Sequence, residues 1–126
     1  MKQKKLFGTS GIRGYAELSG SHSESQDYVS LTDTFCYNIT RAFLEYAAPK
    51  SRTAIFAVGM DLRPSSPRIK DAVIQAILDE GCVVAFQGVT PTPALAYYVK
   101  EKKCAGGIMI TGSHIPGDMN GVKFLL

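Results

Sequence analysis

Apolar positions recur along this chain with two spacings that alternate from one segment to the next. Spacings of three and four residues are typical of helices, whereas short continuous apolar runs between turn formers are typical of buried strands. The pattern predicts helices over residues 30–48, 66–80 and 92–102, and strands over residues 53–58, 82–86, 107–110 and 122–126. Residues 18–27 are polar and rich in turn formers, which predicts an exposed loop.

The first two predicted helices have recognisable ends and an apolar face. Ser30 and Asp33 have the spacing of a capping box at the start of the first helix. In the second helix, Ser66 suits the N-cap, Pro67 the first helical position and Gly81 the C-terminal stop. The predicted buried faces consist of Leu31, Phe35, Ile39, Ala42 and Tyr46 in the first helix, and of Ile69, Val73, Ile77 and Leu78 in the second.

Strands that alternate with helices, joined by short loops, predict an α/β fold. We expect a mixed, mostly parallel sheet with helices on both faces. Ligands of such sheets bind at the carboxyl ends of the strands. Asp61, Thr90 and Ser113 each come just after a predicted strand, so we expect them to lie along one functional edge.

Composition and charge narrow the class of protein. With 126 residues and 45% apolar composition, the chain is long enough for one domain with a core. The net charge of +3 is mild, and the body of the chain has no Lys/Arg run of the kind that nucleic-acid readers carry. No apolar run approaches the length of a membrane span, and the three cysteines lack CxxC spacing, as expected for buried thiols in a reducing compartment. We therefore expect a cytoplasmic protein without nucleic-acid or membrane partners.

The loop after residues 107–110 is the most informative segment. It runs from Thr111 to Lys123, is dense in turn formers, and carries the hydroxyl of Ser113 beside the imidazole of His114. A serine at the point where a buried strand opens into such a loop can meet a substrate with its backbone exposed. A serine supplied with positive charge suits phosphoryl chemistry better than acyl chemistry, because cations hold the transferred phosphate.

Two assignments in the chain leave alternatives open. His114 is not expected to act as the base for Ser113, because neighbours in an extended loop tend to point apart. It either hydrogen-bonds phosphate or substrate, or holds the loop in shape. Asp61 and Arg63 follow a predicted strand, and we favour a local ion pair that shapes the loop over direct contact with substrate.

Spacing excludes several other catalytic motifs. Gly8, Gly11 and Gly14 are three residues apart, which is neither a dinucleotide fingerprint nor a P-loop. Residues 111–115 lack the outer glycines of a hydrolase nucleophile elbow. The two histidines and three cysteines do not complete a zinc motif.

Four segments of the chain together carry a family resemblance. They are Phe7-Gly8-Thr9-Ser10-Gly11-Ile12-Arg13-Gly14, Val58-Gly59-Met60-Asp61-Leu62-Arg63-Pro64-Ser65-Ser66, Thr90-Pro91-Thr92-Pro93 and residues 111–123. In this order and spacing they resemble the signatures of the α-D-phosphohexomutases, the phosphomannomutase/phosphoglucomutase family. One position departs from the family pattern, since Ile115 stands where Asn is usual. We expect this variant to be tolerated, because the rest of the loop is retained.

The resemblance implies an enzyme that interconverts hexose 6-phosphate and hexose 1-phosphate. A phosphoserine would give its group to the sugar, and a bisphosphorylated sugar would return the other phosphate to the serine. Mg²⁺ is the implied cofactor, with hexose 1,6-bisphosphate as activator. The implied site residues are Ser113, Lys123, Arg13 and His114 for catalysis, Thr9, Ser10 and Asn120 for substrate or phosphate binding, and Ser113 again as a metal ligand.

The resemblance extends over nearly the whole chain but only over the first of the family's four domains. Residues 1–126 carry the serine loop, residues 111–123, and contain no Asp-rich D-G-D-G-D-R metal loop. The resemblance therefore implies a first domain that is incomplete at its C-terminus, inactive alone, with a phosphorylated hexose and the remaining domains of a longer chain as partners. Mannose phosphate is the first expected substrate, glucose phosphate the second and glucosamine phosphate the third. A non-catalytic phosphosugar-binding or interaction module of the same fold is the alternative from another class.

Overall fold

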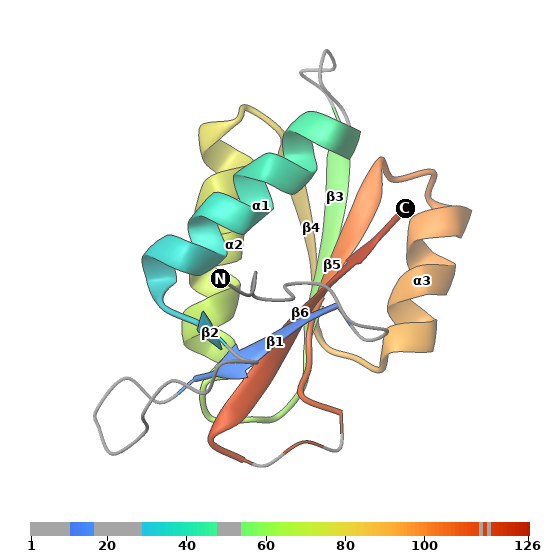
Figure 1. The fold of residues 1–126 in the computed structure, drawn as a ribbon. Helices are drawn as coiled ribbons and strands as arrows, with labels where there is room; N and C mark the ends of the chain where they lie inside the picture. Colours follow the sequence, from blue (N-terminus) through green and yellow to red (C-terminus); the bar gives the residue numbers. More distant parts are fainter. Residues whose placement is uncertain (1–10, 17–28, 48–53, 114, 116) are drawn as a thin grey trace.

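A twisted sheet organises the chain, and a computed structural model describes it for residues 11–16, 29–47, 54–113, 115 and 117–126. The described elements are β1 (Ile12–Tyr15), β2 (Val29–Ser30), α1 (Asp33–Ala47), β3 (Ile55–Met60), α2 (Ser66–Asp79), β4 (Val83–Val89), α3 (Thr92–Glu101), β5 (Gly106–Ile110) and β6 (Met119–Leu125). Across the sheet the strands follow the order β2-β1-β6-β5-β3-β4 (Figure 1). Segments far apart in the sequence therefore meet at β1 and β6.

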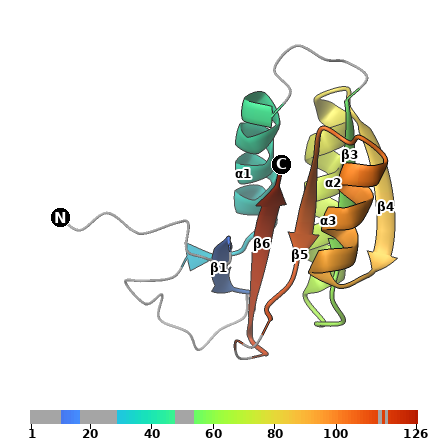
Figure 2. The ribbon, with the colours of Figure 1, turned by 90° about the vertical axis from the view of Figure 1, so that its right-hand side faces the viewer.

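Strand direction in the described sheet is the same for every strand except β6. β3 pairs in parallel with β4 and β5, and β1 pairs in parallel with β2. β6 runs antiparallel to both β1 and β5, and Figure 2 shows the opposed arrows of β5 and β6. The prediction of a mixed, mostly parallel α/β sheet is confirmed.

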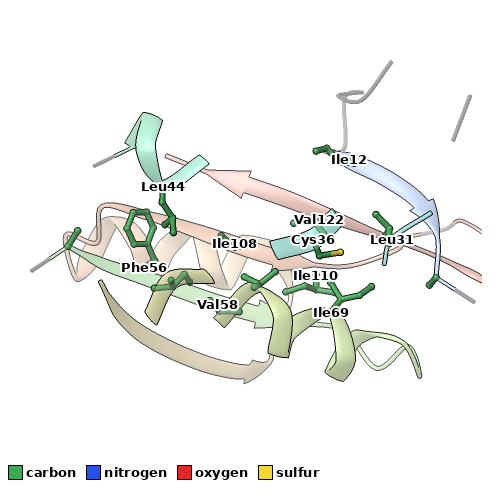
Figure 3. Close-up of a cluster of buried hydrophobic side chains, with 14 residues drawn as sticks. Ile12, Leu31, Cys36, Leu44, Phe56, Val58, Ile69, Ile108, Ile110 and Val122 are labelled. Carbon is green, nitrogen blue, oxygen red and sulfur yellow. The ribbon is translucent and has the colours of Figure 1, made fainter. Parts of the chain in front are cut away.

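The helices cover the sheet on both faces, as predicted. α1 and α2 lie side by side on one face, and α3 lies on the other (Figure 1). Side chains alternate along β3, so that Phe56 and Val58 enter the core beneath α1 and α2, whereas Ala57 packs under α3. Figure 3 shows the larger core, where side chains from both helices meet those of the sheet. Each fully buried side chain of this kind contributes about 1.5–3 kcal/mol to folding.

The first helix begins later than predicted and buries a different stripe. Residues Val29–Ser30 form β2, and the helix is capped by Thr32, whose Oγ1 accepts the N–H of Phe35 at 3.1 Å. The buried residues of α1 are Cys36, Thr40 and Leu44. Two residues of the predicted stripe are exposed instead, Ala42 and Tyr46. The apolar pattern missed this stripe because Thr40 is polar, yet its hydroxyl donates to the carbonyl oxygen of Cys36 at 2.7 Å and is satisfied there.

The second helix has the predicted stop and a corrected start. Gly81 adopts φ +77 and ends the helix, as expected. Ser66 is not the N-cap but the first helical residue, and its hydroxyl donates to Asp61 Oδ1 at 2.6 Å. Ala76 takes a buried position in place of Leu78, which is 53% exposed. The hydroxyl of Ser66 thus serves a contact between elements, which local capping rules do not foresee.

The remaining expectations agree with the structure apart from shifts at element ends. α3 starts at Thr92, as predicted, with Pro91 at its N-cap. β3, β4 and β6 are displaced or extended relative to the predicted ranges, and the expected loop at residues 18–27 lies outside the described residues. The cysteines are free thiols. Cys36 is buried as expected, and burial raises its pKa to about 12, whereas Cys82 and Cys104 are only partly buried. None of the described helices has the length and apolar character that crossing a bilayer requires.

Neighbouring residues of α2 provide a test of this packing. Ile77 is fully buried and Leu78 is 53% exposed. We expect Ile77→Ala to lower the free energy of unfolding by about 2–5 kcal/mol, because it leaves a cavity. Leu78→Ala should lower it by less than about 1 kcal/mol. Urea unfolding of both variants checks this, and equal losses would contradict the packing of α2.

Candidate active site

The carboxyl ends of three parallel strands form one edge of the sheet and carry the candidate site. Asp61 follows β3, Thr90 follows β4 and Ser113 follows β5 by three residues. Backbone hydrogen bonds continue the ladder past the strands: Asp61 N–H donates to the oxygen of Ile110 at 2.9 Å, and Thr90 N–H to that of Met60 at 3.1 Å. Backbone pairing therefore brings the three residues to the edge that was predicted for them. Figure 1 shows β3 between β4 and β5.

Ser113 lies at a sharp turn of the loop after β5. Its φ is +54, a left-handed conformation that costs a non-glycine residue about 1–3 kcal/mol unless its surroundings hold it. Its N–H donates to Thr111 Oγ1 at 3.1 Å, and the N–H of Ile115 donates to the oxygen of Gly112 at 3.1 Å. Ser113 itself is exposed. The turn thus presents a serine to solvent in a backbone shape that needs external support.

Asp61 supplies part of this support. Its Oδ2 accepts the N–H of Gly112 at 3.0 Å, while its Oδ1 accepts the N–H of Arg63 at 3.0 Å and the hydroxyl of Ser66. Partial burial by itself raises the pKa of the Asp61 carboxyl. Hydrogen bonds from Ser66, Gly112, Arg63 and Thr111 outweigh burial and lower that pKa below its ordinary value. Asp61 is therefore a charged anchor for the start of the serine loop.

Arg63 supplies further support for the loop. Its guanidinium donates to the carbonyl oxygens of Ser113 at 3.2 Å, Ile115 at 2.6 Å and Met119 at 3.1 Å. Its Nε lies 3.5 Å from Asp61 Oδ2, so the expected ion pair is present and is confirmed. The contacts with the loop carbonyls were not foreseen, because the sequence predicts a shared edge but not which side chains reach across it.

Asn120 is buried at the start of β6. Its side chain is fully buried, and its amide nitrogen donates to the hydroxyls of Ser65 at 2.8 Å and Ser66 at 3.0 Å. Its amide oxygen accepts the N–H of Gly121 at 2.8 Å. These bonds tie the start of β6 to the start of α2, and the predicted role of Asn120 in substrate or phosphate binding stays a prediction.

Arg13 and Lys123 lie on the face of the sheet away from α1 and α2, the face on which α3 packs. Ile12 and Val122 enter the core beneath those helices, so the alternating positions 13, 121 and 123 face the other way. Arg13 pairs with Gly121, where an added Cβ would lie 3.3 Å from Arg13 Cγ and 2.8 Å from the oxygen of Thr111. Glycine at position 121 therefore lets the arginine stem cross close to the base of the serine loop.

Arg13 and Lys123 lie at different distances from the edge of the sheet that carries the serine loop. Thr111 N–H donates to the oxygen of Gly121 at 3.0 Å, so Arg13, Gly121 and Thr111 are neighbours across adjacent strands. Lys123 pairs with Met109, two residues further along β6, which is about 7 Å farther from the edge at the usual rise per residue. Its long side chain faces away from α1 and α2, as the side chain of Arg13 does.

Some predicted site residues lie outside the described residues. These are Thr9, Ser10 and His114, and their predicted roles stay predictions. Within the described part of the chain, no three His, Cys, Asp or Glu side chains are grouped to hold a metal ion. The Asp61 carboxylate is occupied by its hydrogen bonds, whereas the Ser113 oxygen is of the hard type that Mg²⁺ prefers.

Known proteins have sequences and folds similar to those of this chain. Residues 4–126 match the family model described as phosphoglucomutase/phosphomannomutase, alpha/beta/alpha domain I. A phosphoglucomutase/phosphomannomutase of Thermococcus kodakarensis is 36% identical over 122 residues, which are 96% of this chain and 24% of that protein. A phosphoglucosamine mutase of Pelotomaculum thermopropionicum is 34% identical over 119 residues, 94% of this chain and 24% of that protein.

A solved structure from Thermus thermophilus, provisionally named a phosphomannomutase, superimposes with a TM-score of 0.77 at 28% identity. That match covers 99% of this chain and 26% of the solved chain. The chain thus spans 24% of the length of each of the two curated relatives.

The lowered pKa of Asp61 predicts how stability depends on pH. A carboxyl with a lower pKa in the folded state stabilises the fold above its unfolded pKa of about 3.9, and that stabilisation disappears as pH falls through the folded value. We expect Asp61→Asn to be clearly less stable than wild type at pH 7, and the difference to shrink below about pH 4.

Urea unfolding between pH 2 and 7 measures this difference. Asp71→Asn is the control, because that side chain is 72% exposed. A difference between wild type and Asp61→Asn that stays constant over the whole pH range would contradict the role of the charged carboxylate.

Proposed function

Because this chain belongs to the phosphoglucomutase/phosphomannomutase family, we propose that the protein carrying it interconverts hexose 6-phosphate and hexose 1-phosphate through a phosphoserine at Ser113. The observation that carries the proposal is the exposed serine held in a left-handed turn at the carboxyl edge of the sheet. A nucleophile must be presented and fixed in this way to act on a bound substrate. The longer protein, rather than residues 1–126 alone, is the expected enzyme.

The proposed reaction moves one phosphoryl group at a time. The bond between phosphorus and Ser113 Oγ breaks as a bond forms to a free hydroxyl of the hexose phosphate, and the proton of that hydroxyl moves to a base. The bisphosphorylated sugar then turns around. Its other phosphate returns to Ser113 Oγ, and the sugar oxygen released takes up a proton. No phosphate is gained or lost over the cycle, so hexose 1,6-bisphosphate can prime an unphosphorylated serine.

Arg13 and Lys123 are the proposed cations of this site. Both lie on the face of the sheet away from α1 and α2, and Arg13 lies across from the base of the serine loop. The planar guanidinium of Arg13 suits two phosphate oxygens at once, whereas the ammonium of Lys123 can also exchange a proton with the reacting hydroxyl. His114, Thr9 and Ser10 remain proposed contributors to the site.

Mg²⁺ is the proposed cofactor of the full-length enzyme. Among the described residues Ser113, through its oxygen or its phosphate, is the proposed metal ligand, and further ligands would come from elsewhere in the longer protein. When bound, the ion would offset the concentrated negative charge of the phosphoserine. Within this chain, Ser113 holds the group and the neighbouring cations orient it.

Mannose and glucose phosphates are the proposed substrates, in that order, and glucosamine phosphate belongs in the same screen. All three sugars are included because relatives of similar identity are named phosphoglucomutase/phosphomannomutase or phosphoglucosamine mutase. A screen of the three hexose phosphates with one enzyme preparation ranks them by kcat/KM.

Phosphopeptide mapping tests the carrier serine. After incubation of the full-length protein with Mg²⁺ and hexose 1,6-bisphosphate, we expect phosphate on Ser113, and none on the same peptide in Ser113→Ala. Folded protein without phosphate at Ser113 would overturn the mutase mechanism and favour a phosphosugar-binding module instead.

A charge substitution tests the role of Lys123. We expect Lys123→Ala to lower kcat/KM at least about 100-fold, which is the usual loss when a general acid–base group is removed. Lys100→Ala is the control, because Lys100 is an exposed lysine in the last turn of α3. Steady-state kinetics of the two variants decides the matter, and similar kcat/KM values for both would exclude Lys123 from the reaction.

A further inference from the structure

Arg63 contacts more of the serine loop than any simple ion pair would require. Besides pairing with Asp61, its guanidinium donates to the carbonyl oxygens of Ser113, Ile115 and Met119. These carbonyls span the loop from the candidate nucleophile to the first residue of β6. One guanidinium therefore contacts both ends of the segment from Ser113 to Met119.

The direction of these contacts matters for an anionic substrate. The Arg63 side chain is only 16% exposed, whereas Ser113 is exposed. A carbonyl oxygen carries partial negative charge and would repel a phosphate. The bonds to the Arg63 guanidinium offset that partial charge on the carbonyls of Ser113 and Ile115, next to the exposed serine.

Asp61 makes Arg63 unsuitable as a phosphate ligand and suitable as a scaffold. The carboxylate lies against the guanidinium and offsets its charge, and it also accepts the N–H of Gly112 beside Ser113. The pair thus holds the turn through the donors of Arg63 and the acceptor of Asp61. We propose that Arg63, together with Asp61, is the positioning residue that holds Ser113 in its left-handed conformation for phosphoryl transfer; this inference rests on the proposed function.

The contact requires an arginine at position 63, and the glycine at position 112 leaves room for its guanidinium. A lysine has a single nitrogen and no planar fork, so it cannot reach all three carbonyls and the carboxylate together. Gly112 lies against the face of the guanidinium, and a Cβ at position 112 would overlap with Arg63 Nε and Cζ. Arg63→Lys removes the guanidinium and Gly112→Ala adds a Cβ against it, so both substitutions alter the same contact.

The test uses the full-length protein and a matched control. Arg68 also donates to two carbonyl oxygens, those of Leu31 at 3.0 Å and Ala16 at 2.8 Å, and it pairs with Asp33 at 2.6 Å. These contacts lie just after β1 and β2 and at the start of α1, so Arg68 serves a different part of the fold. Arg63→Lys, Gly112→Ala and Arg68→Lys are compared with wild type by steady-state kinetics, by phosphate incorporation at Ser113, and by hydrogen exchange of the amides of residues 111–121.

We expect Arg63→Lys to lower kcat about 100-fold with KM changed less than about threefold, because a displaced nucleophile loses rate more than binding. Amide exchange in residues 111–121 should accelerate in Arg63→Lys. Both effects should be smaller in Gly112→Ala, because the end of the flexible Arg63 side chain can shift away from an added Cβ. Arg68→Lys should keep the kcat of wild type and the exchange rates of these residues, even if its melting temperature falls. Wild-type kcat in a folded Arg63→Lys would overturn the inference.

Failure of the proposed function gives a different result. In that case wild type itself shows no mutase activity and no phosphate at Ser113. Hydrogen exchange then decides whether Arg63 holds the loop: faster exchange in Arg63→Lys than in Arg68→Lys supports that part of the inference, and equal exchange overturns it.

Discussion

The carboxylate of Asp61 is the contact on which the candidate site depends. It joins the end of β3 to the start of α2 through Ser66, five residues on, and to the start of the serine loop through Gly112, 51 residues on. Hydrogen bonds to a charged group contribute about 1.5–3 kcal/mol each, so this single side chain can offset the strain of the left-handed turn at Ser113. Together with Arg63 it connects this edge of the sheet to the loop.

The antiparallel strand β6 contributes to the core with one face and to the candidate site with the other. Because side chains alternate along the strand, Val122 enters the core beneath α1 and α2, while Lys123 lies on the opposite face together with Arg13 from β1. Asn120, at the start of the same strand, locks it to α2 through two serine hydroxyls. The same strand thus anchors the fold with one set of positions and supplies a cation with the other.

The serine loop is held through its main chain, which explains how Ile115 can replace a polar residue. The N–H of Ile115 donates to Gly112, and its carbonyl oxygen accepts from Arg63. Neither contact involves the side chain at position 115. The shape of the turn is therefore preserved by backbone hydrogen bonds that an isoleucine makes as well as any other residue with an N–H group.

The sequence by itself determined the alternating elements, the α/β class and the edge that carries Asp61, Thr90 and Ser113, because apolar periodicity and turn residues are local signals. It also pointed to the ion pair of Asp61 and Arg63, which are two residues apart. Only the tertiary structure decided that Arg63 grips the serine loop and that Asn120 is buried. Those contacts join residues fifty or more positions apart, and which distant residues meet is set by strand order and packing rather than by neighbouring residues.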